Sequence, residues 1–555
     1  MQSLIEITIG DMLDQTARLY PDHDAVVYTD RSYRRTYAEF AAETDFIARG
    51  LMAMGIKKGD HVAIWATNHQ QWLLTMFATA KIGAIMVTVN TSYKIFELEY
   101  LLRQSDSSTL ILMDGYRDTD YVGILNQLNP ELKNSRPGQS QFVQFPYLKN
   151  VIYFGDKPTP EGMYNWDQLY DMADSVGETA LAERKASLDI HDVINMQYTS
   201  GTTGYPKGVM LTHFNLVNNG KSIADCMAFT ENDRLCITVP FFHCFGMVLA
   251  IIASVSHGTA MIPIEFFNAL AVMEAIQKEK CTAVHGVPTM FIAMLDHPRF
   301  KDFDFSSMRT GIMAGSPCPV KVMRQVVEEM NMPEITIVYG QTEASPGCTQ
   351  TRTYDSLERR VTTVGQVLPH VEARIADPES GETLPQNTPG EFLARGYNVM
   401  KGYYNMPEAT AQAIDEDGWL HTGDLATMDE EGYFKITGRI KDMIIRGGEN
   451  IYPKEIEEFL YTHEAVSDVQ VIAIPSRKYG EEVMAYVIPK ENSQISEEEL
   501  QEFCLANLAR HKCPKHIRFI DAFPMTASGK IQKFKLRDMA IDELNLHDEN
   551  NIETA

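Results

Sequence analysis

A run of small and polar residues, 199–208, carries the strongest chemical signal in the 555-residue chain. It reads TSGTTGYPKG and combines three glycines, four serine or threonine hydroxyls and one lysine. Backbone N–H groups and hydroxyls in such a loop can wrap a polyphosphate, and the lysine can neutralise part of its charge. The predicted phosphate-binding residues are Thr199, Ser200, Gly201, Thr202, Thr203, Gly204, Tyr205, Pro206 and Lys207. The simpler alternative is an ordinary hairpin loop rich in glycine and serine.

This loop differs from the Walker A loop of P-loop NTPases. A Walker A loop has glycine before its lysine and serine or threonine after it, and here Pro206 and Gly208 occupy those positions. Strand-like runs, VINMQY before the loop and GVMLTH after it, indicate that it joins two strands and does not open a helix. The sequence therefore argues against a phosphoryl-transferring P-loop enzyme.

Four charged residues further along the chain stand in short polar motifs. They are Glu343 in YGQTE, Asp424 in TGD, Arg439 in GRIKD and Lys530 in SGK. Taken singly, each is at least as consistent with a solvated charge at a turn or helix start. Their order and spacing along the chain are informative only together.

Together the loop and these motifs, with GGENI at 447–451, resemble the AMP-forming acyl-CoA synthetases. These enzymes belong to the adenylate-forming superfamily, which also holds luciferase and the adenylation domains of peptide synthetases. The resemblance spans nearly the whole chain. The amino-acid sequence of the segments 90–100, 213–219 and 441–453 most resembles the medium-chain acyl-CoA synthetase family, including its mitochondrial family-member-two branch.

The resemblance implies a two-step reaction that uses ATP, Mg²⁺ and coenzyme A. A carboxylate attacks the α-phosphate of ATP, pyrophosphate leaves, and the thiol of coenzyme A captures the acyl-adenylate. Because the first step brings anions together, positioning and charge neutralisation should supply most of the rate.

The resemblance also assigns roles in nucleotide binding. Glu343 is expected to be the magnesium ligand, since one carboxylate beside phosphate oxygens suits an ion that keeps most of its waters. Thr342 is expected to contact the α-phosphate. The remaining nucleotide residues are Tyr339, Gly340, Gly315 and Ser316 at the adenine, and Asp424 and Arg439 at the ribose.

The other implied roles concern the acyl group and the thiol. Lys530 is expected to contact both the incoming carboxylate and the α-phosphate, which screens their repulsion. His243 matches a family histidine near the acyl and adenylate groups, although a lone histidine among aromatic residues is as consistent with the core. The resemblance places a hinge at Lys441 and the pantetheine tunnel at Gly447, Gly448 and Glu449.

The elements that would position these residues alternate between strand and helix. HVAIWAT (61–67) and AIMVTVN (84–90) flank an amphipathic stretch, a pattern typical of α/β proteins. By resemblance, residues 1–440 form a large N-terminal domain of two α/β subdomains plus a distorted β-barrel. Residues 441–555 then form a small mobile α+β lid domain that carries the catalytic lysine.

Composition narrows the class of protein further. The 49 basic and 75 acidic residues give a net charge of −26, which argues against unaided binding of nucleic acid. Eight scattered cysteines without a C-x-x-C pair predict reduced thiols, with neither a disulfide framework nor a zinc site. The N-terminus lacks signal-peptide features, and the longest apolar stretch, 247–255, is shorter than the about 20 residues that span a bilayer. We expect a cytoplasmic protein without an integral membrane segment, as a monomer or homodimer.

The acyl group and its acceptor are the open part of the prediction. No lysine or arginine stands out near the expected acyl pocket, which favours an apolar monocarboxylic acid, in this family a medium-chain fatty acid. An aromatic or alicyclic acid is the alternative. So is delivery of the acyl group to a carrier protein or, as in luciferase, to oxygen. A further alternative is a protein of the same fold that binds ligands but has no catalytic activity.

Overall fold

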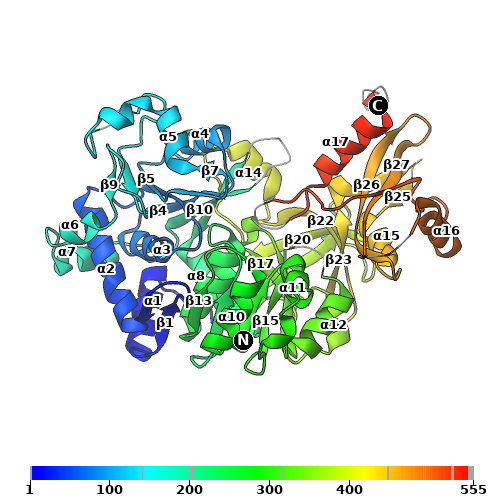
Figure 1. The fold of residues 1–555 in the computed structure, drawn as a ribbon, viewed down its shortest axis with the longest axis horizontal. Coiled ribbons are helices and arrows are strands. Elements are labelled where there is room, and N and C mark those ends of the chain that lie inside the picture. The colour runs from blue at the N-terminus through cyan, green and yellow to red at the C-terminus, as the bar shows by residue number, and fades with distance from the viewer. Residues whose placement is uncertain are drawn as a thin grey trace. The chain divides into compact units, whose positions relative to one another are not determined.

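A computed structural model describes residues 3–139, 142–199, 206–315, 318–446, 449–491, 493, 495–526 and 530–547, with the backbone alone at 449–450. The chain divides into two compact units (Figure 1). The N-terminal unit comprises Met1–Ala373 and Ala394–Leu420, and the C-terminal unit comprises Arg374–Leu393 and His421–Ala555. The α/β and α+β class expected from the sequence is confirmed, with a large N-terminal and a small C-terminal part.

The first sheet of the N-terminal unit has eight strands in the order β21-β11-β10-β4-β3-β5-β8-β9. Strands β10, β4, β3, β5, β8 and β9 run parallel, whereas β11 and β21 are antiparallel additions at one edge. The strands are β3 His61–Trp65, β4 Ile85–Thr88, β5 Thr109–Leu112, β8 Asn150–Tyr153, β9 Tyr164–Asn165, β10 Val193–Thr199, β11 Lys207–Thr212 and β21 Gly402–Tyr403. The predicted strands at 61–67 and 84–90 correspond to β3 and β4.

The second sheet has nine strands in the order β18-β17-β16-β15-β14-β12-β13-β1-β2. Its central strands are parallel, and β2, β17 and β18 close the two edges antiparallel. The strands are β1 Asp24–Val27, β2 Arg34–Thr36, β12 Arg234–Ile237, β13 Ala260–Pro263, β14 Ala283–Gly286, β15 Thr310–Ala314, β16 Glu334–Gly340, β17 Gly347–Gln350 and β18 Gln366–Val367. A small hairpin, β6 Gly115–Tyr116 with β7 Thr119–Asp120, stands apart from both sheets.

Helices cover the two sheets and join them into one core. Helix α8 contacts both β11 of the first sheet and β17 of the second. One continuous cluster of buried apolar side chains includes residues of β3, β4, β12, α3 and α8. The helices are α1 Ile9–Leu19, α2 Tyr37–Ala53, α3 Gln70–Ile82, α4 Ile95–Gln104, α5 Tyr121–Leu128, α6 Gln168–Ala173, α7 Glu178–Ala186, α8 His213–Cys226, α9 Ala253–His257, α10 Ala269–Glu279, α11 Pro288–Leu295, α12 Val320–Glu329, α13 Leu357–Thr362 and α14 Pro407–Ala413.

The C-terminal unit contains a five-stranded sheet in which β27 pairs with β24, β26 and β28, and β24 pairs with β25. Three helices belong to the same unit. The elements are β24 Ile444–Arg446, β25 Glu449–Ile451, α15 Pro453–Leu460, β26 Val466–Ser476, β27 Gly480–Pro489, α16 Glu497–Asn507, β28 His516–Phe519 and α17 Lys533–Leu544.

The expected distorted β-barrel is an open sheet in the described residues. Its four strands follow the order β19-β20-β22-β23 and comprise Val371–Ala376, Gly390–Gly396, Leu420–Met428 and Phe434–Arg439. The strand order leaves β19 and β23 as the two edges, so the described strands do not close into a barrel. The chain passes between the two units within β19, β20 and β22, so residues 421–440 pack with the C-terminal unit. The predicted boundary between residues 440 and 441 concerns a hinge and stays a prediction.

No helix in the described parts of the chain is both long and apolar enough to cross a membrane. The expected cytoplasmic location therefore remains an expectation.

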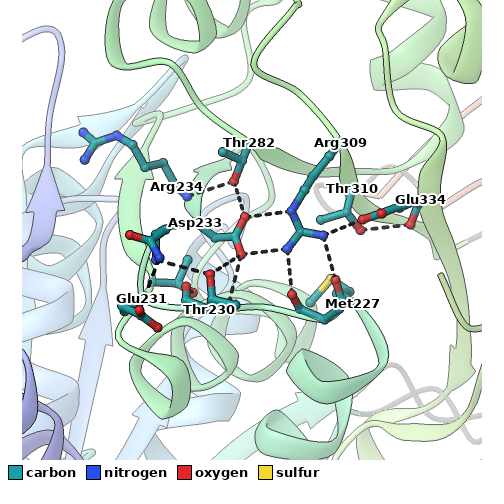
Figure 2. Close-up of polar contacts among 12 residues, drawn as sticks. Met227, Thr230, Glu231, Asp233, Arg234, Thr282, Arg309, Thr310 and Glu334 are labelled. Atoms are coloured by element: carbon teal, nitrogen blue, oxygen red, sulfur yellow. Dashed lines mark hydrogen bonds and ion pairs between the residues drawn. The ribbon is translucent and has the colours of Figure 1, made fainter.

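An ion-pair network ties together the amino ends of four parallel strands in the second sheet (Figure 2). Asp233, Thr282 and Arg309 directly precede β12, β14 and β15, and Glu334 begins β16. Arg309 donates Nε to Asp233 Oδ1 at 3.0 Å and Nη2 to Oδ2 at 2.7 Å, and Nη1 reaches Glu334 at 2.6 Å. Thr282 Oγ1 donates to Asp233 Oδ1 at 2.7 Å. The Asp233 side chain is only 5% exposed.

Asp233→Asn should destabilise the N-terminal unit in a pH-dependent way. Burial alone would raise the pKa of the Asp233 carboxyl, but hydrogen bonds from Arg309 and Thr282 outweigh it and lower that pKa. A lowered pKa stabilises the fold above the carboxyl's unfolded value, and this stabilisation is lost as the pH falls through the native value. We expect a loss of about 2–3 kcal/mol in free energy of unfolding at neutral pH. Since asparagine resembles the protonated acid, the deficit should shrink below about pH 4.

Thermal unfolding of both proteins between about pH 7 and about pH 3.5 measures this difference. Asp302→Asn is the matched control, because the Asp302 side chain is 61% exposed in its ion pair with Arg299 and exposed pairs contribute little. A deficit in Asp233→Asn that is equally large at acid and neutral pH would contradict the role given to the charge.

Candidate active site

The predicted site residues of the N-terminal unit follow the carboxyl ends of the parallel strands, opposite the ion-pair network. Strand β12 ends at Ile237, six residues before His243, and β15 ends at Ala314, directly before Gly315. Strand β16 ends at Gly340, and a 3₁₀ turn, Thr342–Ala344, follows it. Because parallel strands bring their carboxyl ends to one edge, where ligands of α/β proteins bind, these motifs share a single edge of the sheet.

Glu343 is held by side chains from two other segments of the N-terminal unit. Its Oε1 accepts hydrogen bonds from the Tyr403 hydroxyl at 2.9 Å and from Thr199 Oγ1 at 3.4 Å. Its backbone carbonyl accepts the N–H of Met400 at 2.9 Å. Within the described ranges Oε2 has no hydrogen-bond partner. The structure thus brings Glu343 to the end of the predicted phosphate loop and leaves one carboxylate oxygen for a ligand.

The two ends of the predicted phosphate loop are paired with each other. Thr199 is the last residue of β10 and faces Lys207, the first residue of β11, across an antiparallel ladder. Lys207 Nζ lies 4.8 Å from the centre of the Tyr403 ring, a cation–π distance. Pro206 accepts a hydrogen bond on its carbonyl from the Tyr100 hydroxyl at 3.0 Å. The predicted strand–loop–strand arrangement is therefore present.

Several predicted residues lie outside the described part of the chain. They are Ser200, Gly201, Thr202, Thr203, Gly204, Tyr205, Ser316, Gly447 and Gly448, and the side chain of Glu449. Their predicted roles stay predictions.

Thr342 and His243 meet through Cys244. Cys244 Sγ lies 3.6 Å from Thr342 Oγ1 and 3.8 Å from His243 Nδ1. Nδ1 also accepts the backbone N–H of Phe245 at 3.1 Å. A neutral histidine whose Nδ1 accepts carries its proton on Nε2, so His243 can offer an N–H donor to an oxygen atom.

Backbone geometry explains two glycines of the predicted adenine border. At Gly340 a Cβ would lie 1.8 Å from the carbonyl oxygen of Pro346, so no side chain fits. Gly315 has a φ of +91°, a conformation that favours glycine. Tyr339, in β16, pairs with Thr349 of β17.

Asp424 and Arg439 lie opposite each other on β22 and β23 of the C-terminal unit. Arg439 donates Nε to Asp424 Oδ1 at 2.9 Å. The carboxylate is 8% exposed, whereas the guanidinium is 50% exposed. The backbone N–H of Gly423, the residue before Asp424 in the TGD motif, binds the Glu391 side chain at 3.0 Å. The structure therefore brings together the two residues predicted to bind the ribose.

Lys530 stands at the end of a short loop in the same unit. Its backbone N–H binds Thr526 Oγ1 at 3.0 Å, and its carbonyl accepts the N–H of Thr526 at 2.8 Å. Residues 527–529 between them lie outside the described residues.

Two of three basic residues near these motifs have side-chain partners, and the third is exposed. Arg446 contacts Glu482 through two nitrogens, one at 3.1 Å, and stacks on Tyr479 at 4.1 Å. In the basic run that follows Lys530, the sequence alone favours solvated side chains at Lys533 and Lys535. For Lys533 this interpretation is wrong, because it binds Glu457, a buried carboxylate of α15, at 2.6 Å and the carbonyl of Val471 at 2.9 Å. Lys535 is exposed.

His285 of β14 is a buried core residue, and both of its ring nitrogens have backbone partners. Its Nδ1 accepts the N–H of Ile312 at 3.2 Å, and its Nε2 lies 3.0 Å from the carbonyl of Leu249. Burial lowers the pKa of His285 to about 4. The ring is therefore neutral at physiological pH and offers no positive charge.

Tyr403 is the residue that sequence reasoning missed. Burial and the Glu343 carboxylate raise the pKa of its hydroxyl, so it remains a hydrogen-bond donor. The available signal was the sequence GYYNMP at 402–407, in which Gly-Tyr precedes a proline that begins α14. This signal indicates a strand and a helix start but not the partner of the hydroxyl.

Comparison with known protein families shows which family the chain belongs to. The family of AMP-binding enzymes matches residues 13–404, and the C-terminal domain of AMP-binding enzymes matches residues 455–530. The chain belongs to the AMP-binding enzymes. It is an AMP-forming acid–CoA ligase of the adenylate-forming superfamily, on the branch of the medium-chain family-member-two ligases.

Relatives and solved structures agree with this membership of the AMP-binding enzymes. YngI of Bacillus subtilis (strain 168), whose name places it provisionally among acyl-CoA synthetases, is 58% identical over 546 residues, 98% of this chain and 99% of that protein. The mitochondrial medium-chain acyl-CoA ligase ACSF2 of Bos taurus is 40% identical over 546 residues, 97% of this chain and 88% of that protein.

Solved structures of related enzymes share the fold, among them the two that follow. ATP-bound MatB from Rhodopseudomonas palustris has a TM-score of 0.82 at 28% identity, over 96% of this chain and 99% of MatB. The o-succinylbenzoate CoA synthetase MenE of Bacillus subtilis, solved with its acyl-adenylate, has a TM-score of 0.76 at 27% identity, over 96% and 99%. The expected use of ATP and of an acyl-adenylate route is thereby supported.

Proposed function

We propose that this AMP-binding enzyme converts an apolar monocarboxylic acid of medium chain length to its coenzyme A thioester, with Mg²⁺·ATP as the energy source. The segment that follows His243, Phe245–Ile252, is apolar and buried throughout. The one basic side chain of β14, His285, is held neutral by burial. A second carboxylate on the substrate would find no positively charged partner in these two segments. This observation is the main support for a monocarboxylic substrate. The name of the ACSF2 relative supports medium chain length.

An aromatic or alicyclic acid is the second candidate substrate. The MenE neighbour acts on o-succinylbenzoate, which shows that this fold accepts a ring. Transfer of the acyl group to a carrier protein is the second candidate acceptor.

The residues of the N-terminal unit fit one magnesium ion bound with the nucleotide. Among the described residues no cluster of three or more histidine, cysteine, aspartate or glutamate side chains could hold a metal by itself. Glu343, a single carboxylate with one oxygen that has no partner among the described residues, suits Mg²⁺, which takes its other ligands from phosphates and water. When bound, the ion would neutralise phosphate charge. Thr199 and Tyr403 keep Glu343 oriented, and Lys207 supplies a positive charge at the end of the loop.

The remaining roles follow the family pattern. Asp424 and Arg439 bind the ribose, Thr342 contacts the α-phosphate, and His243 donates Nε2–H toward the acyl or adenylate oxygens. Lys530 screens the repulsion between the substrate carboxylate and the α-phosphate. Gly447, Gly448 and Glu449 line the passage for the pantetheine arm of coenzyme A.

The function is tested by release of pyrophosphate and AMP from Mg²⁺·ATP with a panel of acids from acetate to palmitate, plus benzoate and cyclohexanecarboxylate. Each acid is assayed with and without coenzyme A. We expect AMP release that depends on the acid, peaks at medium chain length and rises when coenzyme A is added. A maximum at benzoate would favour the ring-containing substrates, and pyrophosphate release that ignores coenzyme A would favour another acceptor.

Lys530→Ala should slow adenylation by roughly 10²–10³-fold, because the charge that offsets the repulsion between two anions is lost. Thioester formation from supplied acyl-adenylate should stay close to the wild-type rate. Pyrophosphate exchange and single-turnover thioester formation measure the two steps separately. The exposed Lys535→Ala is the control, and equal loss of both half-reactions in Lys530→Ala would refute the assigned role.

Lys441→Pro should block the second step selectively if the chain rotates at residue 441 between the steps. Lys441 is exposed in a 3₁₀ turn, Ile440–Asp442, and proline fixes its φ angle near −65°. Pyrophosphate exchange should persist while overall thioester production falls. Lys441→Ala, which keeps the backbone free, is the control, and wild-type turnover in Lys441→Pro would exclude a hinge at this residue.

A further inference from the structure

The short segment 400–404 is bonded to both parts of the nucleotide site in the N-terminal unit. On one side, the N–H of Met400 binds the carbonyl of Glu343 at 2.9 Å. On the other, the N–H groups of Lys401 and Tyr404 bind the carbonyls of Met210 and Gly208 at 3.0 and 2.8 Å. These bonds set the separation between the Glu343 turn and the strand that leaves the phosphate loop.

One side chain of this segment contacts the charged group on each side. The Tyr403 hydroxyl donates to Glu343 Oε1 at 2.9 Å, and the face of its ring lies 4.8 Å from Lys207 Nζ. The side chain is 8% exposed, so water competes weakly for either contact. A hydrogen bond to a carboxylate and a cation–π contact are both stronger when partly desolvated.

The backbone of Tyr403 is itself held in place. Its N–H binds Thr410 Oγ1 of helix α14 at 2.9 Å. The preceding Gly402 has a φ of +139°, and a Cβ there would lie 2.9 Å from Thr410 Cγ2. The backbone from which the ring projects is therefore anchored to α14 and not to Glu343 or Lys207.

We propose that Tyr403 is a positioning residue that orients the Glu343 carboxylate toward Mg²⁺ through its hydroxyl and retains the Lys207 ammonium beside the nucleotide phosphates through its ring. With Oε1 occupied by two hydroxyl donors, Oε2 becomes the oxygen presented to the metal. The inference rests on the proposed binding of Mg²⁺·ATP at Glu343. It adds Tyr403, which contacts neither the metal ion nor the nucleotide. Partners that orient a metal ligand typically contribute a factor of about 10–100 to metal affinity.

Tyr403→Phe tests the hydroxyl, because the ring and its contact with Lys207 remain. The full-length protein is titrated with Mn²⁺ in the presence of ATP and without any acid, and free Mn²⁺ is followed by EPR. We expect the Mn²⁺ concentration at half-saturation to rise about tenfold, while the affinity for ATP without metal stays at the wild-type value. This readout needs no turnover.

Tyr404→Phe is the matched control. It removes the hydroxyl of the next residue, which also donates to a carboxylate, Asp106, at 2.9 Å. A general loss of packing should affect both variants alike, and should lower metal-free and metal-dependent ATP affinity together. The ratio of the two affinities in the folded fraction therefore decides the outcome even if Tyr403→Phe is less stable.

Tyr403→Leu tests the ring. It should repeat the loss of metal affinity and in addition weaken metal-free binding of ATP about threefold, because Lys207 loses its aromatic partner. Wild-type affinity for Mn²⁺·ATP in Tyr403→Phe would overturn the inference while leaving the proposed function intact. Failure of the wild-type protein to bind Mn²⁺·ATP would overturn both.

Discussion

Two hydroxyl donors hold the Glu343 carboxylate in one orientation, in a chain whose net charge is −26. In the proposed function, free rotation of this carboxylate would let its negative charge face the nucleotide phosphates directly and add to the repulsion between the anions. Hydroxyl donors from Tyr403 and Thr199 remove this freedom, and they come from strands that are more than 200 residues apart in the sequence. Much of the architecture of the N-terminal unit serves to bring β10, β16 and β21 to this point.

The direction of the parallel strands in the second sheet separates stability from chemistry. At the amino ends, Arg309 and Asp233 form a dense set of charge-assisted hydrogen bonds with backbone and side-chain partners (Figure 2). At the carboxyl ends, the strands are followed by turns that contain Gly315, Thr342 and Glu343. The amino edge of this sheet thus carries an ion-pair network around the buried Asp233, and the carboxyl edge carries the short turns of the candidate site.

Two histidines differ in how deeply they are buried and in the groups that their rings contact. His285 uses both ring nitrogens on backbone groups and is neutral, so its hydrogen-bonding capacity is used up within the core. His243 accepts the backbone N–H of Phe245 on Nδ1 and lies beside Cys244, which also contacts Thr342 of the candidate site. The atoms that their rings contact, which belong to Leu249 and Ile312 for His285 and to Phe245 for His243, distinguish the two residues.

The sequence by itself determined the family, the alternation of strands and helices, and the residue types of the site, because these depend on local composition and on the order of short motifs. The family resemblance also assigned Asp424 and Arg439 to one ribose, and the structure shows that β22 and β23 pair these two residues directly. The tertiary structure alone decided that Tyr403 binds Glu343, that Lys533 pairs with Glu457, and that the four-stranded sheet is open. Each of these depends on contacts between segments far apart in the chain, whose partners are chosen by packing and carry no local pattern that a single sequence reveals.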